Sequence, residues 1–333
     1  MLFLLIFLVL LGLALVMLGF SLRREPPVKW PFRQFRDKSG IRSDVVALTA
    51  PFRSAEHLRL YESFRERGVK VIGFTHYQEF PESIRNPHED MYHKENSFDY
   101  IDACDGWCYF HRDPDSVGLP QGRRLDIVES DFADCARLRS LVDMSAPKRF
   151  DFVYCLPRER VDANATEQCT LGWQAVHRNW TLAEECIKVL CAIGLRGIIV
   201  GRTCSHMQQP GCVHVTADLP YQEFLQLLRD SRFLFLPGIV EASPRKLTEA
   251  LCLDTPVLMN RDILGGWKYM NAQTGAFFTD EKDVAAAARK VLRLTSTRAA
   301  FEARWGKAPS SRRLAAFLRK LDIDTDDTVM LKI

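Results

Sequence analysis

The sequence predicts an α/β protein with two doubly wound parallel sheets, because short apolar runs alternate with amphipathic stretches along most of its 333 residues. The clearest unit is 233–260, which reads FLFLPGIVEASPRKLTEALCLDTPVLMN. Its two outer segments are continuously apolar, as expected of strands buried on both faces. Its middle places Leu247, Ala250 and Leu251 on one face of a helix. The unit therefore predicts strand, loop, helix and strand in a parallel sheet.

A small first domain is expected over 43–147. Leu58, Tyr61 and Phe64 share one face of a predicted helix that ends at Gly68. Apolar runs before and after this helix predict a βαβ start. The predicted strands are 45–48, 69–74, 106–111 and 125–128, and the predicted helices are 55–67 and 132–144.

A second domain is expected over 148–296, because strands and helices alternate there four times. The order indicates a doubly wound sheet, which binds ligands at the carboxyl ends of its strands. Around the central unit, the predicted strands are 150–156, 198–200 and 213–215, and the predicted helices are 179–193, 221–230 and 281–294.

The two ends of the chain have their own character. Residues 2–22 are uncharged and apolar, long enough for a transmembrane helix, and no basic segment or cleavage site favours a signal peptide instead. We therefore expect a single-pass membrane anchor at 1–22 and a basic juxtamembrane linker at 23–42. Residues 297–333 are read as a basic C-terminal helix and tail, with Leu314, Phe317 and Leu318 as its apolar stripe.

Compartment signals in the sequence disagree. Basic residues follow the apolar run, which predicts the bulk of the chain on the cytosolic face. Asn164-Ala-Thr and Asn179-Trp-Thr match the glycosylation pattern, which leaves the Golgi or ER lumen as the second choice. Four of the ten cysteines lie in apolar patterns and are interpreted as free thiols of a reducing compartment: Cys155, Cys186, Cys191 and Cys252.

Two carboxylates bracket the turn of the central unit, Glu241 in the loop and Glu249 in the helix. This string resembles the glutamate-x7-glutamate motif of retaining GT-B glycosyltransferases of the group 1, or family-4-like, class. The resemblance covers 148–294 and is densest over 233–257. It implies a GT-B-like fold with a reduced N-terminal domain, with Glu241 against the donor sugar and Glu249 against the nucleotide ribose.

Such a site must stabilise the negative charge that develops on a departing nucleoside diphosphate. The resemblance implies that protein cations do this, with no metal ion or other cofactor. Arg178 and Lys246 are the first candidates, because each lies at a helix start. The loop after the first strand of the second domain lacks the Gly-Arg-x(n)-Lys-Gly pattern that is usual in the family it resembles. The other candidate donor-binding residues are Arg158, Arg202, Gly238, Ser243 and Arg245, with Ser243 as a possible N-cap.

The expected function is transfer of a hexose or pentose from a nucleotide diphosphate sugar to a hydroxyl of a glycan, lipid or protein, with retention of configuration. The alternative is a non-catalytic nucleotide- or sugar-binding module on the same scaffold. The formal net charge of +3 does not suggest a nucleic-acid partner. Two metal readings are weaker: a zinc site at Cys104, Cys108 and His111, and an Asp113-x-Asp115 metal motif.

Overall fold

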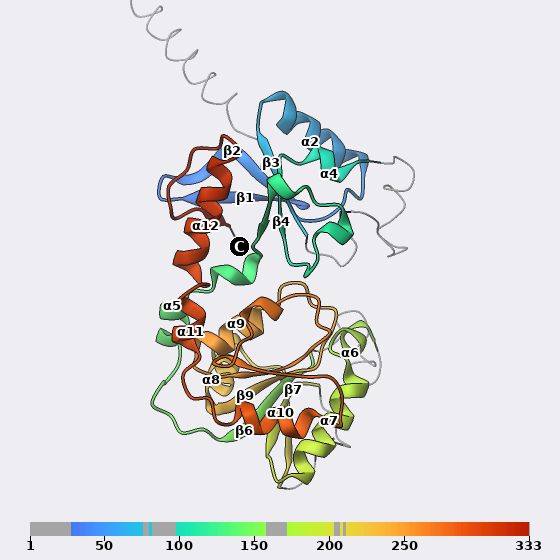
Figure 1. The fold of residues 1–333 in the computed structure, drawn as a ribbon, viewed down its shortest axis with the longest axis vertical. Coiled ribbons are helices and arrows are strands. Elements are labelled where there is room, and N and C mark those ends of the chain that lie inside the picture. The colour runs from blue at the N-terminus through green and yellow to red at the C-terminus, as the bar shows by residue number, and fades with distance from the viewer. Residues whose placement is uncertain are drawn as a thin grey trace, which may run out of the picture.

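The computed structural model describes residues 28–75, 80–81, 98–157, 172–202, 207–208 and 211–332. It contains two sheets of six strands each, one in each of two lobes stacked along the long axis (Figure 1). The α/β class and the division into two sheet-based domains are therefore confirmed. The segment 2–22 lies outside the described residues, and within them no helix is both long enough and apolar enough to cross a bilayer.

The first sheet is parallel in its centre and antiparallel at one edge. Its faces are covered by α2 (Ala55–Glu66) with the short α4 (Tyr100–Ala103), and by α12 (Lys307–Arg319). Three short 3-10 turns follow β4 and β5: η1 (Asp115–Val117), η2 (Gln121–Arg123) and η3 (Glu129–Phe132). In sheet order, the strands are β12 (Met330–Leu331), β1 (Phe32–Asp37), β2 (Gly40–Leu48), β3 (Lys70–Phe74), β4 (Gly106–Tyr109) and β5 (Arg124–Asp126).

Two segments expected outside the first domain complete its sheet. Strand β1 falls in the predicted linker, where Phe32 pairs with Leu48 and Phe35 with Leu331 of the C-terminal strand β12. Helix α12 of the predicted basic tail lies beside the same sheet (Figure 1). Its apolar stripe is buried in the core on that face of the sheet. The first domain therefore also takes segments from outside 43–147, because its core needs apolar side chains from both ends of the chain.

The second sheet is parallel throughout. One face packs on α8 (Tyr221–Asp230), α9 (Arg245–Cys252), α5 (Cys135–Ser140) and α11 (Arg298–Glu302). The other packs on α6 (Trp173–His177), α7 (Trp180–Ala192) and α10 (Val284–Val291). In sheet order, the strands are β11 (Gly275–Phe278), β10 (Val257–Asn260), β9 (Ser231–Leu236), β6 (Phe150–Cys155), β7 (Gly197–Gly201) and β8 (Val213–Ala217).

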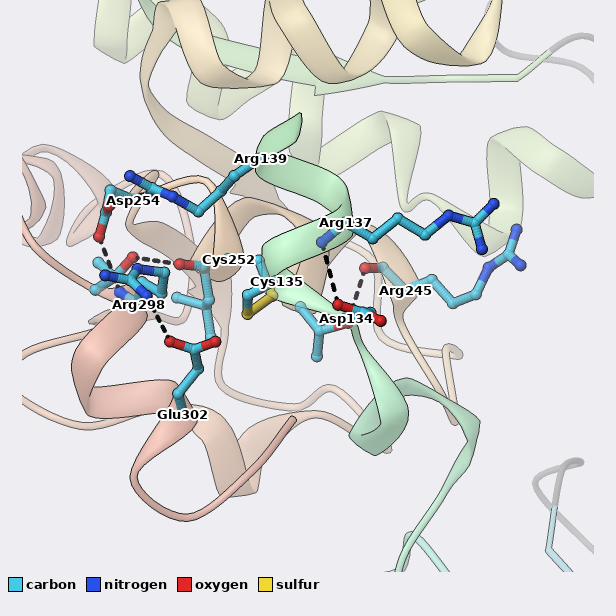
Figure 2. Close-up of a disulfide and its surroundings, with 12 residues drawn as sticks. Asp134, Cys135, Arg137, Arg139, Arg245, Cys252, Asp254, Arg298 and Glu302 are labelled. Atoms are coloured by element: carbon cyan, nitrogen blue, oxygen red, sulfur yellow. Dashed lines mark hydrogen bonds and ion pairs between the residues drawn. A yellow bond between two sulfur atoms is a disulfide. The ribbon is translucent and has the colours of Figure 1, made fainter. Parts of the chain in front are cut away.

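The interpretation of Cys191 and Cys252 as free thiols is wrong. Cys252, the last residue of α9, forms a disulfide with Cys135, the first residue of α5 (Figure 2). Cys191 forms a second disulfide with Cys212. Cys191 and Cys252 lie in apolar helical patterns, so periodicity could not separate them from core thiols. Cys155 and Cys186 are free, as expected.

Candidate active site

The two central strands of the second sheet, β6 and β9, define the point from which the sheet is built outward. From β6 the chain adds β7 and β8 on one side, and then returns to add β9 on the other side. In doubly wound sheets, the loops after such a pair of strands separate and leave a crevice for ligands. Here those loops lead to α6 and α9, the helices that carry the predicted site residues.

Arg178 and Glu241 meet across this crevice. Arg178 is the C-cap of α6, Glu241 lies in the loop between β9 and α9, and the two side chains form an ion pair. Only 16% of the Arg178 side chain and 12% of the Glu241 side chain are exposed. Burial lowers the pKa of Arg178. Within the described residues, Glu241 Oε2 has no hydrogen-bond partner, which leaves one carboxylate oxygen for a ligand.

Lys246 lies beside this pair, one residue into α9. With Arg178, Gly238 and Cys155 it lines a cavity of about 10 Å³, room for about one water molecule. Burial lowers the pKa of Lys246, and the neighbouring Arg178 charge adds to this effect. Burying two cations away from water is unfavourable, and so is their mutual repulsion. An anion bound between Arg178 and Lys246 would offset both of these unfavourable terms.

Glu249 occupies a different place from Glu241. It is 8% exposed, and its Oε1 accepts a hydrogen bond of 2.8 Å from the hydroxyl of Tyr221, the first residue of α8. Burial and the Glu249 charge raise the pKa of Tyr221. Glu249, Arg245 and Tyr221 line a pocket of about 560 Å³ between the two domains, a volume suited to a nucleotide-sized ligand.

The predicted site residues thus form two groups around α9. Arg178, Gly238, Glu241 and Lys246 belong to the crevice after β6 and β9, and Arg245 and Glu249 belong to the interdomain pocket. The helical turn explains the split, since positions 245 and 249 lie on one face of α9 and position 246 points about 100° away.

The expected N-cap role of Ser243 is wrong. Helix α9 begins at Arg245 after Pro244, and its N-terminus has no side-chain cap. Ser243 instead contacts the first domain, where its hydroxyl accepts from the Ser130 N–H at 3.1 Å and lies 2.8 Å from the Ser130 hydroxyl. The partners across the interface take the oxygen that would otherwise cap the helix.

Arg202 is fully buried at the end of β7, where its Nε donates to the Pro157 carbonyl at 2.9 Å. Its side chain therefore anchors the loop after β6. The other arginine predicted in that loop, Arg158, lies outside the described residues. Gly238 fits its place because a Cβ there would lie 2.9 Å from the His177 carbonyl oxygen.

Sequence reasoning missed two features of the site. The first is Tyr221, whose signal is an aromatic residue at a helix start after Pro220. The second is the segment at Leu264 and Gly265, which is hydrogen-bonded to the loop that carries Glu241. The Leu264 N–H donates to the Ile239 carbonyl, and the Gly265 N–H donates to the Glu241 carbonyl. A Cβ on Gly265 would lie 1.7 Å from the Ala242 carbonyl oxygen, so a glycine is needed there. The Gly265-Gly266 dipeptide is the sequence feature that could have pointed to this loop.

Within the described residues, no group of three or more His, Cys, Asp or Glu side chains is arranged so that it could hold a metal ion. The zinc alternative fails for a geometric reason. Cys104 and Cys108 are both buried, but they belong to the apolar clusters on opposite faces of the first sheet.

Comparison with solved structures identifies the fold. The structure is similar to TarM, with a TM-score of 0.53 and 10% identity over 84% of this chain and 54% of TarM. It is similar to the pneumococcal O-GlcNAc transferase GtfA, solved with UDP and GlcNAc, with a TM-score of 0.53 and 13% identity over 83% of this chain and 56% of GtfA. The chain therefore spans about half the length of these two proteins.

A third similar structure is the lipopolysaccharide outer core galactosyltransferase WaaB, with a TM-score of 0.55 and 12% identity over 83% of this chain and 75% of WaaB. No protein-family model and no curated protein sequence matches the chain. At these identities the similarity establishes the fold, which is the two-domain, Rossmann-like GT-B arrangement.

Proposed function

We propose that this chain is a glycosyltransferase that moves a sugar from a nucleotide diphosphate sugar to a hydroxyl acceptor with retention of configuration. GtfA is an O-GlcNAc transferase and WaaB a galactosyltransferase by name, and the fold is shared. The single observation that carries the proposal is the position of Arg178, Glu241 and Lys246 at the carboxyl ends of β6 and β9.

The crevice has the charges that this chemistry requires. As the glycosidic bond breaks, negative charge grows on the departing phosphate and positive charge grows on the sugar. Arg178 and Lys246 supply fixed positive charge for the phosphate without a metal ion. Glu241 supplies a carboxylate oxygen that orients the sugar hydroxyls and lies near the positive ring. The ion pair with Arg178 holds that carboxylate in place before substrate binds.

Glu241→Gln should keep the fold and most of the nucleotide affinity but lower turnover roughly a hundredfold, near 2.7 kcal/mol of barrier. The amide keeps the shape of the side chain but removes the charge that stabilises the transition state. Steady-state kinetics compares this variant with Glu223→Gln, an exposed control on α8. Full activity of Glu241→Gln contradicts the role of this residue, and a product of inverted anomeric configuration contradicts retention.

Glu249→Ala should weaken binding of free UDP roughly tenfold or more, since a hydrogen bond to a buried charge contributes about 1.5–3 kcal/mol. Tyr221→Phe is the matched control, because it removes only the hydroxyl that donates to Glu249 and leaves the aromatic ring and the carboxylate. Isothermal titration with UDP measures both. Equal affinities for Glu249→Ala and the parent chain would exclude a ribose contact.

A non-catalytic binding module is the second candidate. One observation favours it: the Arg178–Glu241 ion pair engages the proposed sugar-binding carboxylate, and the cavity behind it holds about one water molecule. Hydrolysis of a nucleotide sugar without acceptor separates the two. Slow release of sugar that depends on Glu241 supports an enzyme, and tight binding without any release supports a module.

We further propose that the chain is membrane-anchored through residues 2–22, with its domains in an oxidising compartment such as the Golgi or ER lumen. Two disulfides favour this side over the cytosolic side that the basic residues suggested. In sealed vesicles from cells that make the full chain, the domains should resist added protease until detergent is present. Digestion without detergent would place them in the cytosol.

A further inference from the structure

The interdomain pocket carries more positive charge than its ion pairs account for. Five cations line it, from both domains: Arg36, Arg137, Arg245, Lys307 and Lys332. Its three acids are Glu129, Asp134 and Glu249. Each acid already has a partner, because Glu129 binds Arg33, Asp134 binds Lys307 and Glu249 accepts from Tyr221. Positive charge therefore remains in the pocket.

Arg137 and Arg245 are the centre of this excess charge. Arg137 lies on α5, which packs against the second sheet, and Arg245 is the first residue of α9. Figure 2 shows the two guanidinium groups extending in the same direction from their helices. Both act electrostatically on the Tyr221 hydroxyl, which places them at the same wall of the pocket. Within the described residues, neither guanidinium forms an ion pair.

The backbone brings these like charges together despite their repulsion. The Cys135–Cys252 disulfide joins α5 to α9 with a Cα–Cα distance of 4.7 Å, and Arg139 of α5 binds Asp254 beyond α9 at 2.7 Å (Figure 2). Arg245 also opposes the dipole of α9, because it lies in the first turn. An anion between the two guanidinium groups would remove both costs.

We propose that Arg137 and Arg245 form a two-arginine site for a substrate phosphate group in the interdomain pocket. Arginine forks match phosphate oxygens in pairs of hydrogen bonds. The proposal rests on the proposed function in one respect: the phosphate group that binds here is part of a substrate of the proposed glycosyltransferase. That phosphate comes from the nucleotide donor, whose ribose would lie at Glu249, or from a phosphorylated acceptor.

Calorimetric titration of the full chain at fixed ionic strength tests the site with three probes: UDP, uridine and glucose 1-phosphate. The variants are Arg137→Gln, Arg245→Gln and their double, and the control is Arg289→Gln, an exposed arginine on α10. Both pocket arginines are exposed, so the fold should be kept, which the melting temperature verifies.

If the donor supplies the phosphate, each single variant weakens UDP binding roughly tenfold, and uridine binding stays as in the control. If an acceptor supplies it, glucose 1-phosphate binding weakens by a similar factor and UDP binding does not change. Both results support the site. Equal binding of both phosphate probes by the variants and the control overturns it, as does the absence of phosphate-dependent binding to the parent chain. Failure of the parent chain to bind UDP or uridine would instead count against the donor proposal, and glucose 1-phosphate then decides the two-arginine site alone.

Discussion

Replacing Lys268 with Met should lower the free energy of unfolding by about 3–5 kcal/mol. Lys268 lies in η6 (Trp267–Tyr269) of the second domain, and its Nζ is 2.7 Å from Asp126 Oδ1 and 2.7 Å from Asp131 Oδ2 of the first domain. The Lys268 side chain is 4% exposed and that of Asp131 is fully buried. Burial raises the pKa of Asp131, and the Lys268 charge opposes that rise. Without Lys268, a buried carboxylate is left uncompensated.

Urea denaturation measures this loss. Lys188→Met is the matched control, because Lys188 also contacts two acids, Glu184 and Glu185, but at the exposed surface of α7. The control should change stability little, since exposed ion pairs contribute little. Adding Asp131→Asn to Lys268→Met should recover part of the loss by removing the orphaned charge. A Lys268→Met midpoint equal to that of the control contradicts the expectation.

The second domain could be predicted from sequence because its elements are local. Helix α8 has the predicted limits of 221 and 230, and strand β9 contains the predicted run 233–236. Strands β7 and β10 are buried along their whole length, and β9 is buried from Phe233 to Leu236, so these apolar runs can be recognised without knowledge of their partners. The same locality placed Glu241 after a buried strand, and in the structure it follows β9.

The first domain and the details of the site depend on contacts between distant residues. Strand β1 pairs with β12 from the other end of the chain, and no periodic pattern announces that partner. The ion pair between Arg178 and Glu241 joins loops after two different strands. Tyr221 reaches Glu249 only because α8 and α9 pack side by side. Such geometry follows from the sheet order, which sequence patterns do not specify.

Replacing Cys135 and Cys252 together with alanine should destabilise the chain by about 2–5 kcal/mol. The disulfide closes a loop with a sequence separation of 117, and Cys252 is fully buried at the C-terminal end of α9. In the chain-entropy view, a long closed loop restricts the unfolded chain more than a short one. Alanine also leaves unfilled space where two buried sulfur atoms packed.

The Cys191–Cys212 disulfide is the matched control, because it closes a loop with a separation of only 21. The same double replacement there should cost about 1.5 kcal/mol less, the difference that the logarithm of loop length gives. Denaturation of both variants, without reductant, shows which replacement lowers the free energy of unfolding more. If removing Cys191–Cys212 costs as much or more, loop length does not control the effect. Cys135–Cys252 also ties the connection between the domains to the helix of Glu249 and Arg245, so its loss should destabilise the interdomain pocket first.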